Sequence, residues 1–353
     1  MIYHVSLVLK HYLSWANAFH YVSFRAMAAL LTSLSLSFLF GDRYIKASGK
    51  FFRSKAREWT PDSHRAKDNM PTMGGLFILG TVFASCLLWC NLQSAYVWIA
   101  LLCISGFGAI GFWDDWSKIS HRKGISAKLK SRLQILVALI VAILLYISGI
   151  STAVSVPLFT SFSPVLGILF IPWVIFILVA FSNAVNLTDG LDGLAIGSLI
   201  INYCTFAIIA YLAGHATIAA YLHMPLAASS EVSVLAASLV GASIGFLWYN
   251  AYPAQIFMGD VGSLALGSVL ALIGIMAKQE LLLPLAGGLF VVEVLSVILQ
   301  VASFKYFGKR LFKMAPIHHH FELLGWPEAK IVTRFSIITL ILCILALMLL
   351  KVQ

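Results

Sequence analysis

The chain has 353 residues, of which 60% are hydrophobic and only 11% are charged. A water-soluble domain carries roughly 25% charged residues, so this composition excludes an ordinary soluble enzyme. The formal net charge is +10, but the cations are divided among several segments that flank apolar runs. That distribution argues against a nucleic-acid-binding surface and predicts no nucleic-acid partner.

Apolar runs of about 20 residues recur along the whole chain, and each is long enough to cross a bilayer as a helix. The runs are continuous rather than alternating, which favours helices over a transmembrane β-barrel. The sequence therefore predicts an all-α polytopic membrane protein with about ten transmembrane helices in a single domain, residues 1–353. In chain order the spans are expected near 22–40, 73–90, 95–113, 132–150, 165–183, 191–213, 233–250, 262–277, 281–304 and 335–350.

The basic residues predict the orientation of these spans. Eight Lys/Arg lie in 41–72, six in 114–132 and six in 305–334, which together make 20 of the 24. Connections rich in Lys and Arg stay on the cytoplasmic side, and with ten spans both termini then face outward. The cytoplasmic loops are expected at about 41–72, 114–131, 184–190, 251–261 and 305–334.

Five aspartates stand out against this apolar background. Asp114 and Asp115 close the third span in GFWDDWSK, Asp189 and Asp192 lie in NAVNLTDGLDGLA, and Asp260 lies in FMGDVGS. All five fall on connections assigned to the inner side, and acids next to membrane spans are costly and usually functional. We therefore expect one shared site at the inner edge of the membrane.

These acids fit either of two roles, a helix cap or a binding site. An aspartate beside a helix start can be a simple N-cap, and Thr188 and Asp189 suit that role. Glycines next to three of the acids, Asp189, Asp192 and Asp260, favour a binding site, because glycine lets backbone approach a ligand and helix starts offer free N–H groups to phosphate. Lysines on the same side, Lys118 and Lys130 among them, would attract an anionic substrate. Mg²⁺ takes carboxylate and phosphate oxygens, so the residues indicate Mg²⁺-assisted phosphoryl chemistry at a membrane surface.

The last inner loop contains MAPIHHHFELLGWPE, residues 314–328. Adjacent histidines on a helix point about 100° apart, so three in a row cannot easily bind one ion, and the spacing of a zinc site is missing. Contacts with phosphate or nucleotide, or positioning of the loop, are the favoured interpretations. Glu293 is a separate acid within the ninth span, where a structural partner is the expected explanation.

Five motifs in family order resemble one known group of enzymes. PTMGG (71–75), GFWDDW (111–116), NAVNLTDGLDGLA (183–195), FMGDVGSLALG (257–267) and MAPIHHHFELLGWPE (314–328) are similar to motifs of the polyprenyl-phosphate N-acetylhexosamine-1-phosphate transferases. The resemblance runs from about residue 20 to the C-terminus. The histidine-rich motif is the discriminating one, and it points to the phospho-N-acetylmuramoyl-pentapeptide transferase branch.

This resemblance implies a ten-helix bundle in the bacterial cytoplasmic membrane, with both termini periplasmic and the active site on the cytoplasmic face. It implies transfer of phospho-MurNAc-pentapeptide from UDP-MurNAc-pentapeptide to undecaprenyl phosphate, giving UMP and lipid I for peptidoglycan synthesis. Mg²⁺ is the implied cofactor. Membrane lipids and a second copy of the chain, in a homodimer, are the implied partners.

The resemblance also implies roles for individual residues. Asp260 is expected to bind Mg²⁺ with Asp114 and Asp115 close by, Lys130 to stabilise phosphate charge, and His318 to lie near the metal or the diphosphate. Asp114 would orient, or accept the proton from, undecaprenyl phosphate. Phe257 and Lys118 would sandwich the uracil. The remaining substrate contacts implied are Lys67, Thr72, Asn186, Asp189, Gly190, Leu191, Asp192, Asn250, Gln300 and His319.

Several alternatives stay open at this level. A two-step route through a covalent phosphoryl-enzyme competes with direct attack, and a sister enzyme using UDP-GlcNAc competes with the muramoyl branch. A secondary transporter would bind at the bilayer midplane through paired repeats, and neither feature is seen. One departure is that Asn69-Met70 precedes Pro71 where the family usually reads GTPTMGG, which changes the loop that carries Lys67 and Thr72.

Overall fold

The computed structural model describes residues 1–351 except 11, 53–69, 122, 158–161 and 228, and these described residues form helices and no strand. Among the described residues, nine helices are long and apolar enough to cross a membrane, which confirms the predicted all-α polytopic membrane fold. The elements are α1 (Ile2–Leu9), η1 (Ser14–His20), α2 (Val22–Phe51), α4 (Gly74–Trp89), α5 (Ala95–His121), α6 (Ala127–Ile147), η2 (Gly167–Leu169), α7 (Phe170–Thr188), α8 (Leu194–Ala213), α9 (Ala216–Tyr221), α10 (Ser230–Asn250), α11 (Gly259–Met276), η3 (Glu280–Leu282), α12 (Leu283–Ala286), α13 (Gly288–Phe307), α14 (Ile317–Glu322) and α15 (Glu328–Leu349).

Each of the ten expected spans coincides with helix, but two differ in form. The second is α4, an apolar helix of 16 residues, shorter than the other nine. The ninth is interrupted, because η3 and α12 precede α13 and the break falls at Gly287. A Cβ at Gly287 would lie 2.7 Å from the Phe181 ring, so glycine lets the chain turn directly against α7.

Two helices continue well beyond the apolar runs that predict them. α2 reaches Phe51, so residues 42–51 are helical rather than the start of an irregular loop. α5 reaches His121, which puts Asp114 and Asp115 on the helix itself. Neither extension contains a proline, and helix propensity does not end where hydrophobicity does.

α10 and α11 form the centre of the bundle. In the apolar stretches of these two helices, 83% and 89% of the residues are buried, against 22% in α2 and in α13 at the periphery. Small residues allow this close packing: a Cβ on Gly75 would lie 2.1 Å from the Gly262 nitrogen, and a Cβ on Gly111 would lie 2.2 Å from the Asp260 carbonyl oxygen. The start of α11 is thereby pressed between α4 and α5.

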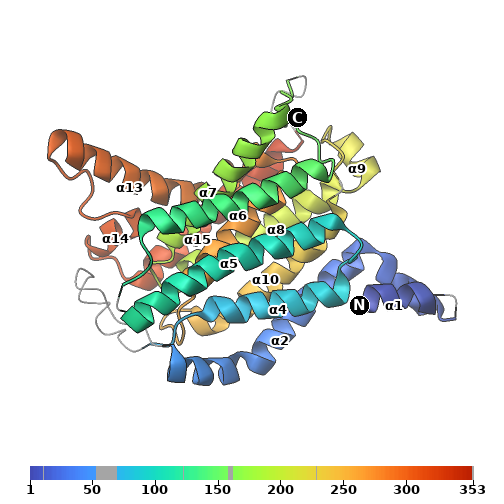
Figure 1. Cartoon of the computed structure of the whole chain (residues 1–353), viewed down its shortest axis with the longest axis horizontal. Helices are drawn as coiled ribbons and strands as arrows, with labels where there is room; N and C mark the ends of the chain where they lie inside the picture. The colour runs from blue at the N-terminus through green and yellow to red at the C-terminus, as the bar shows by residue number, and fades with distance from the viewer. Residues whose placement is uncertain (11, 53–69, 122, 158–161, 228, 352–353) are drawn as a thin grey trace.

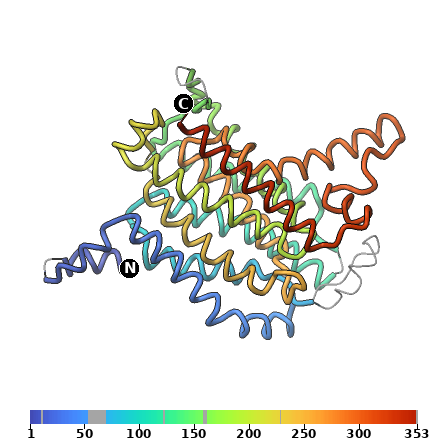
Figure 2. The backbone as a smooth tube through the Cα atoms, turned by 180° about the vertical axis from the view of Figure 1, so that it is seen from behind, coloured from blue at the N-terminus to red at the C-terminus, as the bar shows by residue number. Residues whose placement is uncertain are grey.

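The long helices run side by side, while α13 leans away from the bundle at the end that also carries α14 (Figures 1 and 2). Both chain termini lie toward the opposite end (Figure 1). The end of α5 and the starts of α6 and α11 meet at the α14 end, and the predicted acids lie there.

Candidate active site

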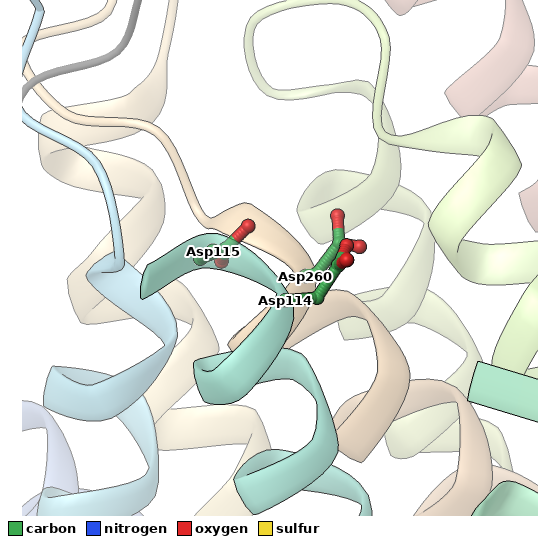
Figure 3. Close-up of side chains that lie close together, drawn as sticks. All are labelled: Asp114, Asp115 and Asp260. Atoms are coloured by element: carbon green, nitrogen blue, oxygen red, sulfur yellow. The ribbon is translucent and has the colours of Figure 1, made fainter. Parts of the chain in front are cut away.

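Three of the five predicted aspartates form one cluster. Asp114 and Asp115 lie near the end of α5 and Asp260 lies in the first turn of α11, with side chains that gather between the two helices (Figure 3). One carboxylate oxygen from each lies within 4.8 Å of the others. Asp114 is 4% and Asp115 6% exposed, so the like charges are held together out of water and need compensation.

Two lysines supply that compensation. Lys118 Nζ lies 2.8 Å from Asp114 Oδ2, 3.1 Å from Asp115 Oδ1 and 3.1 Å from Asp260 Oδ2. Lys130, in the first turn of α6, makes an ion pair with Asp260 and lies 3.4 Å from Asp114 Oδ2. Two ammonium groups face three carboxylates, so the cluster keeps excess negative charge.

Backbone and amide donors fix the carboxylates in place. The Ile125 N–H donates to Asp114 Oδ1 at 2.8 Å and the Val261 N–H to Asp115 Oδ2 at 3.2 Å. Asn186, on α7, donates to Asp260 Oδ1 at 3.1 Å. Gly259 has φ +75° and a Cβ there would lie 2.5 Å from Asp115 Oδ2, so glycine is needed for α11 to begin against the cluster.

Asp189 lies near the cluster and Asp192 has a different environment. Burial, followed by the negative charges of Asp260 and Asp115, raises the pKa of the Asp189 carboxyl to about 8. Asp192 is 3% exposed, and its Oδ2 accepts a hydrogen bond from the Ala254 N–H at 3.0 Å. Asp189 thus lies near the acidic cluster, whereas Asp192 joins the connection between α7 and α8 to the connection between α10 and α11.

His318 is buried against the same connection. Its Nδ1 lies 3.1 Å from Glu293 Oε2, and neither side chain is exposed. A Cβ on Gly190 would lie 2.3 Å from His318 Nε2, and that nitrogen has no hydrogen-bond partner among the described residues. The imidazole is therefore oriented by Glu293, with Nε2 directed at Gly190. Glu293 therefore has the structural partner that the sequence led us to expect. That partner is His318, a predicted site residue, and the sequence did not predict this pairing.

The other histidines of the loop make local contacts. His319 Nδ1 lies 2.5 Å from Glu322 Oε2. His320 Nδ1 accepts a hydrogen bond from the Lys313 N–H at 3.1 Å, and its ring packs edge-on against Phe312.

The remaining predicted contacts surround the cluster or support its loops. Asn250 binds the Gly193 N–H through Oδ1 at 3.1 Å and the Ile256 carbonyl through Nδ2 at 2.8 Å. Gln300 accepts from the Phe312 N–H at 2.9 Å, which ties α13 to the following loop. The structure also describes Thr72 and Phe257, whose backbones make hydrogen bonds. Leu191 is buried beside α15. Lys67 lies outside the described residues.

These donors fit a hard divalent cation bound beside phosphate. All three clustered ligands are carboxylates, the oxygen donors that Mg²⁺ prefers, and no thiol or imidazole belongs to the group. Two lysines and the start of α11 would stabilise an anionic partner. Fold and site together define a membrane-embedded protein equipped for phosphoryl-group chemistry.

Comparison with known proteins gives the family. Residues 97–278 match the family model of glycosyl transferase family 4. The chain is 48% identical to the phospho-N-acetylmuramoyl-pentapeptide-transferases of Citrifermentans bemidjiense and of Geobacter sp. strain M21, and 47% identical to that of Pelobacter propionicus, over the full length of both chains in each case. The chain therefore belongs to the phospho-N-acetylmuramoyl-pentapeptide transferases within glycosyl transferase family 4.

Proposed function

We propose that this protein transfers phospho-MurNAc-pentapeptide from UDP-MurNAc-pentapeptide to undecaprenyl phosphate, forming lipid I and UMP. The observation that carries the proposal is the cluster of Asp114, Asp115 and Asp260 between two lysines, in a chain of this family. Both substrates are anionic and one is a lipid, so the reaction needs positive charge and a metal at a membrane surface.

Mg²⁺ is the proposed cofactor, held by Asp260 with Asp115 and Asp114. Its chemistry would be to neutralise the diphosphate and the departing UMP. The fit rests on three carboxylate oxygens within 4.8 Å. Lys118 and Lys130 form ion pairs with the same carboxylates. We expect these carboxylates to bind Mg²⁺ when substrate binds, and the lysines to turn to the substrate phosphates.

The protein groups divide the remaining work. Lys130 reaches Asp260 and Asp114 from α6, and we assign it to the phosphate being transferred. Asp114, fixed by the Ile125 N–H, would orient undecaprenyl phosphate or accept its proton for direct attack. A two-step route would instead use an aspartate as nucleophile, and trapping a covalent sugar-phosphate adduct after an acid quench would favour it.

The nucleotide is assigned to the connection between α7 and α8. Asp189 and Gly190 belong to this segment and Asn186 lies in the last turn of α7 before it. Phe257 lies on the neighbouring connection, with its backbone bonded to Pro71 and Gly74. Lys118 would have to leave the carboxylates to reach a uracil ring, so we assign it first to the cluster. Asp192 would act by shaping the connection, because its carboxylate is bonded to the Ala254 N–H.

We infer that the α14 end faces the cytoplasm and that both termini are periplasmic. The basic segments after α2, α5 and α13 support this orientation. A bacterial inner-membrane location and a homodimer are proposed on the same family grounds. Cysteine labelling from either side of the membrane, near His121 and near Lys351, tests the orientation directly.

The proposed reaction is tested with purified protein in detergent. UDP-MurNAc-pentapeptide, undecaprenyl phosphate and Mg²⁺ should give UMP and a lipid-linked product in equal amounts. UDP-GlcNAc in place of the muramoyl substrate is the matched control and should give none. Efficient use of UDP-GlcNAc would instead support the sister activity.

A further inference from the structure

Two amide side chains face each other within the membrane-spanning part of α6 and α7. Asn183 Nδ2 donates to Gln134 Oε1 at 2.9 Å, and Gln134 Nε2 donates to Asn183 Oδ1 at 3.4 Å. Gln134 is 1% exposed, so its amide is satisfied by this partner rather than by water. The pair joins two helices below the acidic cluster.

A polar link adds a directional constraint to the packing of α6, because apolar burial alone gives a membrane helix little preference for one rotation. Ile135, Leu136 and Ile140 are each about half exposed on its outer face. In hydrocarbon these residues gain nothing by turning inward, since lipid is as apolar as the protein interior. Gln134 lies on the buried face, which continues at helical spacing from Lys130 to Ala138, and a polar residue there can mark that face unambiguously.

The pair closes a ring of contacts around Asp260. Lys130 lies one turn from Gln134 on α6 and makes the ion pair with Asp260. Asn186 lies one turn from Asn183 on α7 and donates to the other oxygen, Asp260 Oδ1, at 3.1 Å. The two helices that hold the Asp260 carboxylate are thus joined to each other one turn deeper.

We propose that the Gln134–Asn183 pair is a positioning element of the active site. It fixes the rotation and depth of α6 against α7, so that Lys130 stays in contact with Asp260. Neither amide touches the cluster, and both act through Lys130. This inference rests on the proposed function, because Lys130 is assigned there to the transferred phosphate.

Turnover of single, double and exchanged variants provides the first test. Gln134→Leu and Asn183→Leu should each lower kcat about tenfold through a small displacement of Lys130, with KM for the UDP substrate unchanged. The double variant should be no worse than either single one, because both changes break one interaction. The exchange of the two amides, Gln134→Asn with Asn183→Gln, should restore most of the rate. Additive losses without rescue would overturn the inference.

Chemical labelling of Lys130 provides a second test that needs no turnover. A water-soluble N-hydroxysuccinimide ester, read by mass spectrometry, should modify Lys130 several-fold faster in Gln134→Leu, because the ion pair with Asp260 is loosened. The matched control is Asn202→Leu, which removes a buried amide bonded to the Ser198 carbonyl of its own helix, and it should change neither labelling nor kcat. Unchanged labelling of Lys130 in Gln134→Leu would overturn the inference. A wild-type protein that releases no UMP would overturn the proposed function instead, while the labelling comparison would still decide the position of Lys130.

Discussion

His318 Nδ1 lies 3.1 Å from Glu293 Oε2, and both side chains are completely buried where α13 meets α14. A carboxylate in this position accepts a hydrogen bond from Nδ1–H and fixes the tautomer of the ring, while Nε2 faces the connection between α7 and α8. The pair therefore links a helix that leans away from the bundle (Figure 1) to the proposed nucleotide segment.

Glu293→Gln should lower turnover roughly tenfold, the scale of losing a carboxylate that orients a histidine. The amide keeps the size of the side chain but no longer fixes the Nδ1 tautomer. Steady-state kinetics measure the loss of turnover. UMP affinity is the control and should stay near the wild-type value. Glu293→Ala leaves the buried His318 Nδ1 without its hydrogen-bond partner and should also reduce stability, by about 1–3 kcal/mol. Wild-type turnover in Glu293→Gln would show that the pair serves packing alone.

His318→Ala should lower kcat about 100-fold, the usual scale for a group that takes part in proton transfer in the transition state. The loss should fall on kcat more than on KM. His320→Ala is the matched control, since His320 binds the Lys313 N–H and packs on Phe312, and it should act mainly on thermal stability. If His318→Ala only raised KM, the loop would be a recognition element.

Asp192→Ala should weaken UMP binding about tenfold, the effect expected of a lost buried hydrogen bond to a loop. The carboxylate accepts the Ala254 N–H, and without it the two connections beside the nucleotide separate. Asp192→Asn keeps an acceptor oxygen and should retain most of the affinity. Calorimetric titration with UMP distinguishes the two variants. A loss confined to binding of undecaprenyl phosphate would reverse the assignment.

The long apolar runs were enough to predict the spans, because bilayer thickness sets helix length whatever the helix packs against. The ends of α2 and α5 were not predictable from hydropathy, since a helix can continue into water past the point where the sequence stops being apolar. The sequence could predict that Asp114, Asp115 and Asp260 lie close together, because all three fall on connections assigned to the same side of the membrane. The pairings of Glu293 with His318 and of Gln134 with Asn183 could not be, because they depend on helix rotation, and an apolar sequence carries no signal for it.

Asp189 should make the stability of metal-free protein depend on pH. Its pKa is raised from 3.8 to about 8 in the folded state, so the folded protein holds a proton that the unfolded chain has lost. The stabilisation that this protonated carboxyl contributes is therefore fully present below about pH 4 and is lost as the pH rises to about 8. Thermal melting in EDTA should show this decline in the wild type and less of it in Asp189→Asn. Mg²⁺, by neutralising the neighbouring acids, should stabilise the protein more at pH 8 than at pH 6. Equal slopes in both proteins would contradict the placement of Asp189.

Asp260 is proposed to hold the metal on which transfer depends, and its replacement by asparagine tests this role. Asp260→Asn keeps the shape of the side chain and one of its two acceptor oxygens, but the charge that binds Mg²⁺ is lost. At saturating Mg²⁺, with UDP-MurNAc-pentapeptide and undecaprenyl phosphate, the wild type should release UMP and form lipid I, and the folded variant should be at least about 1,000-fold slower. Near-normal UMP release by well-folded Asp260→Asn would contradict the account.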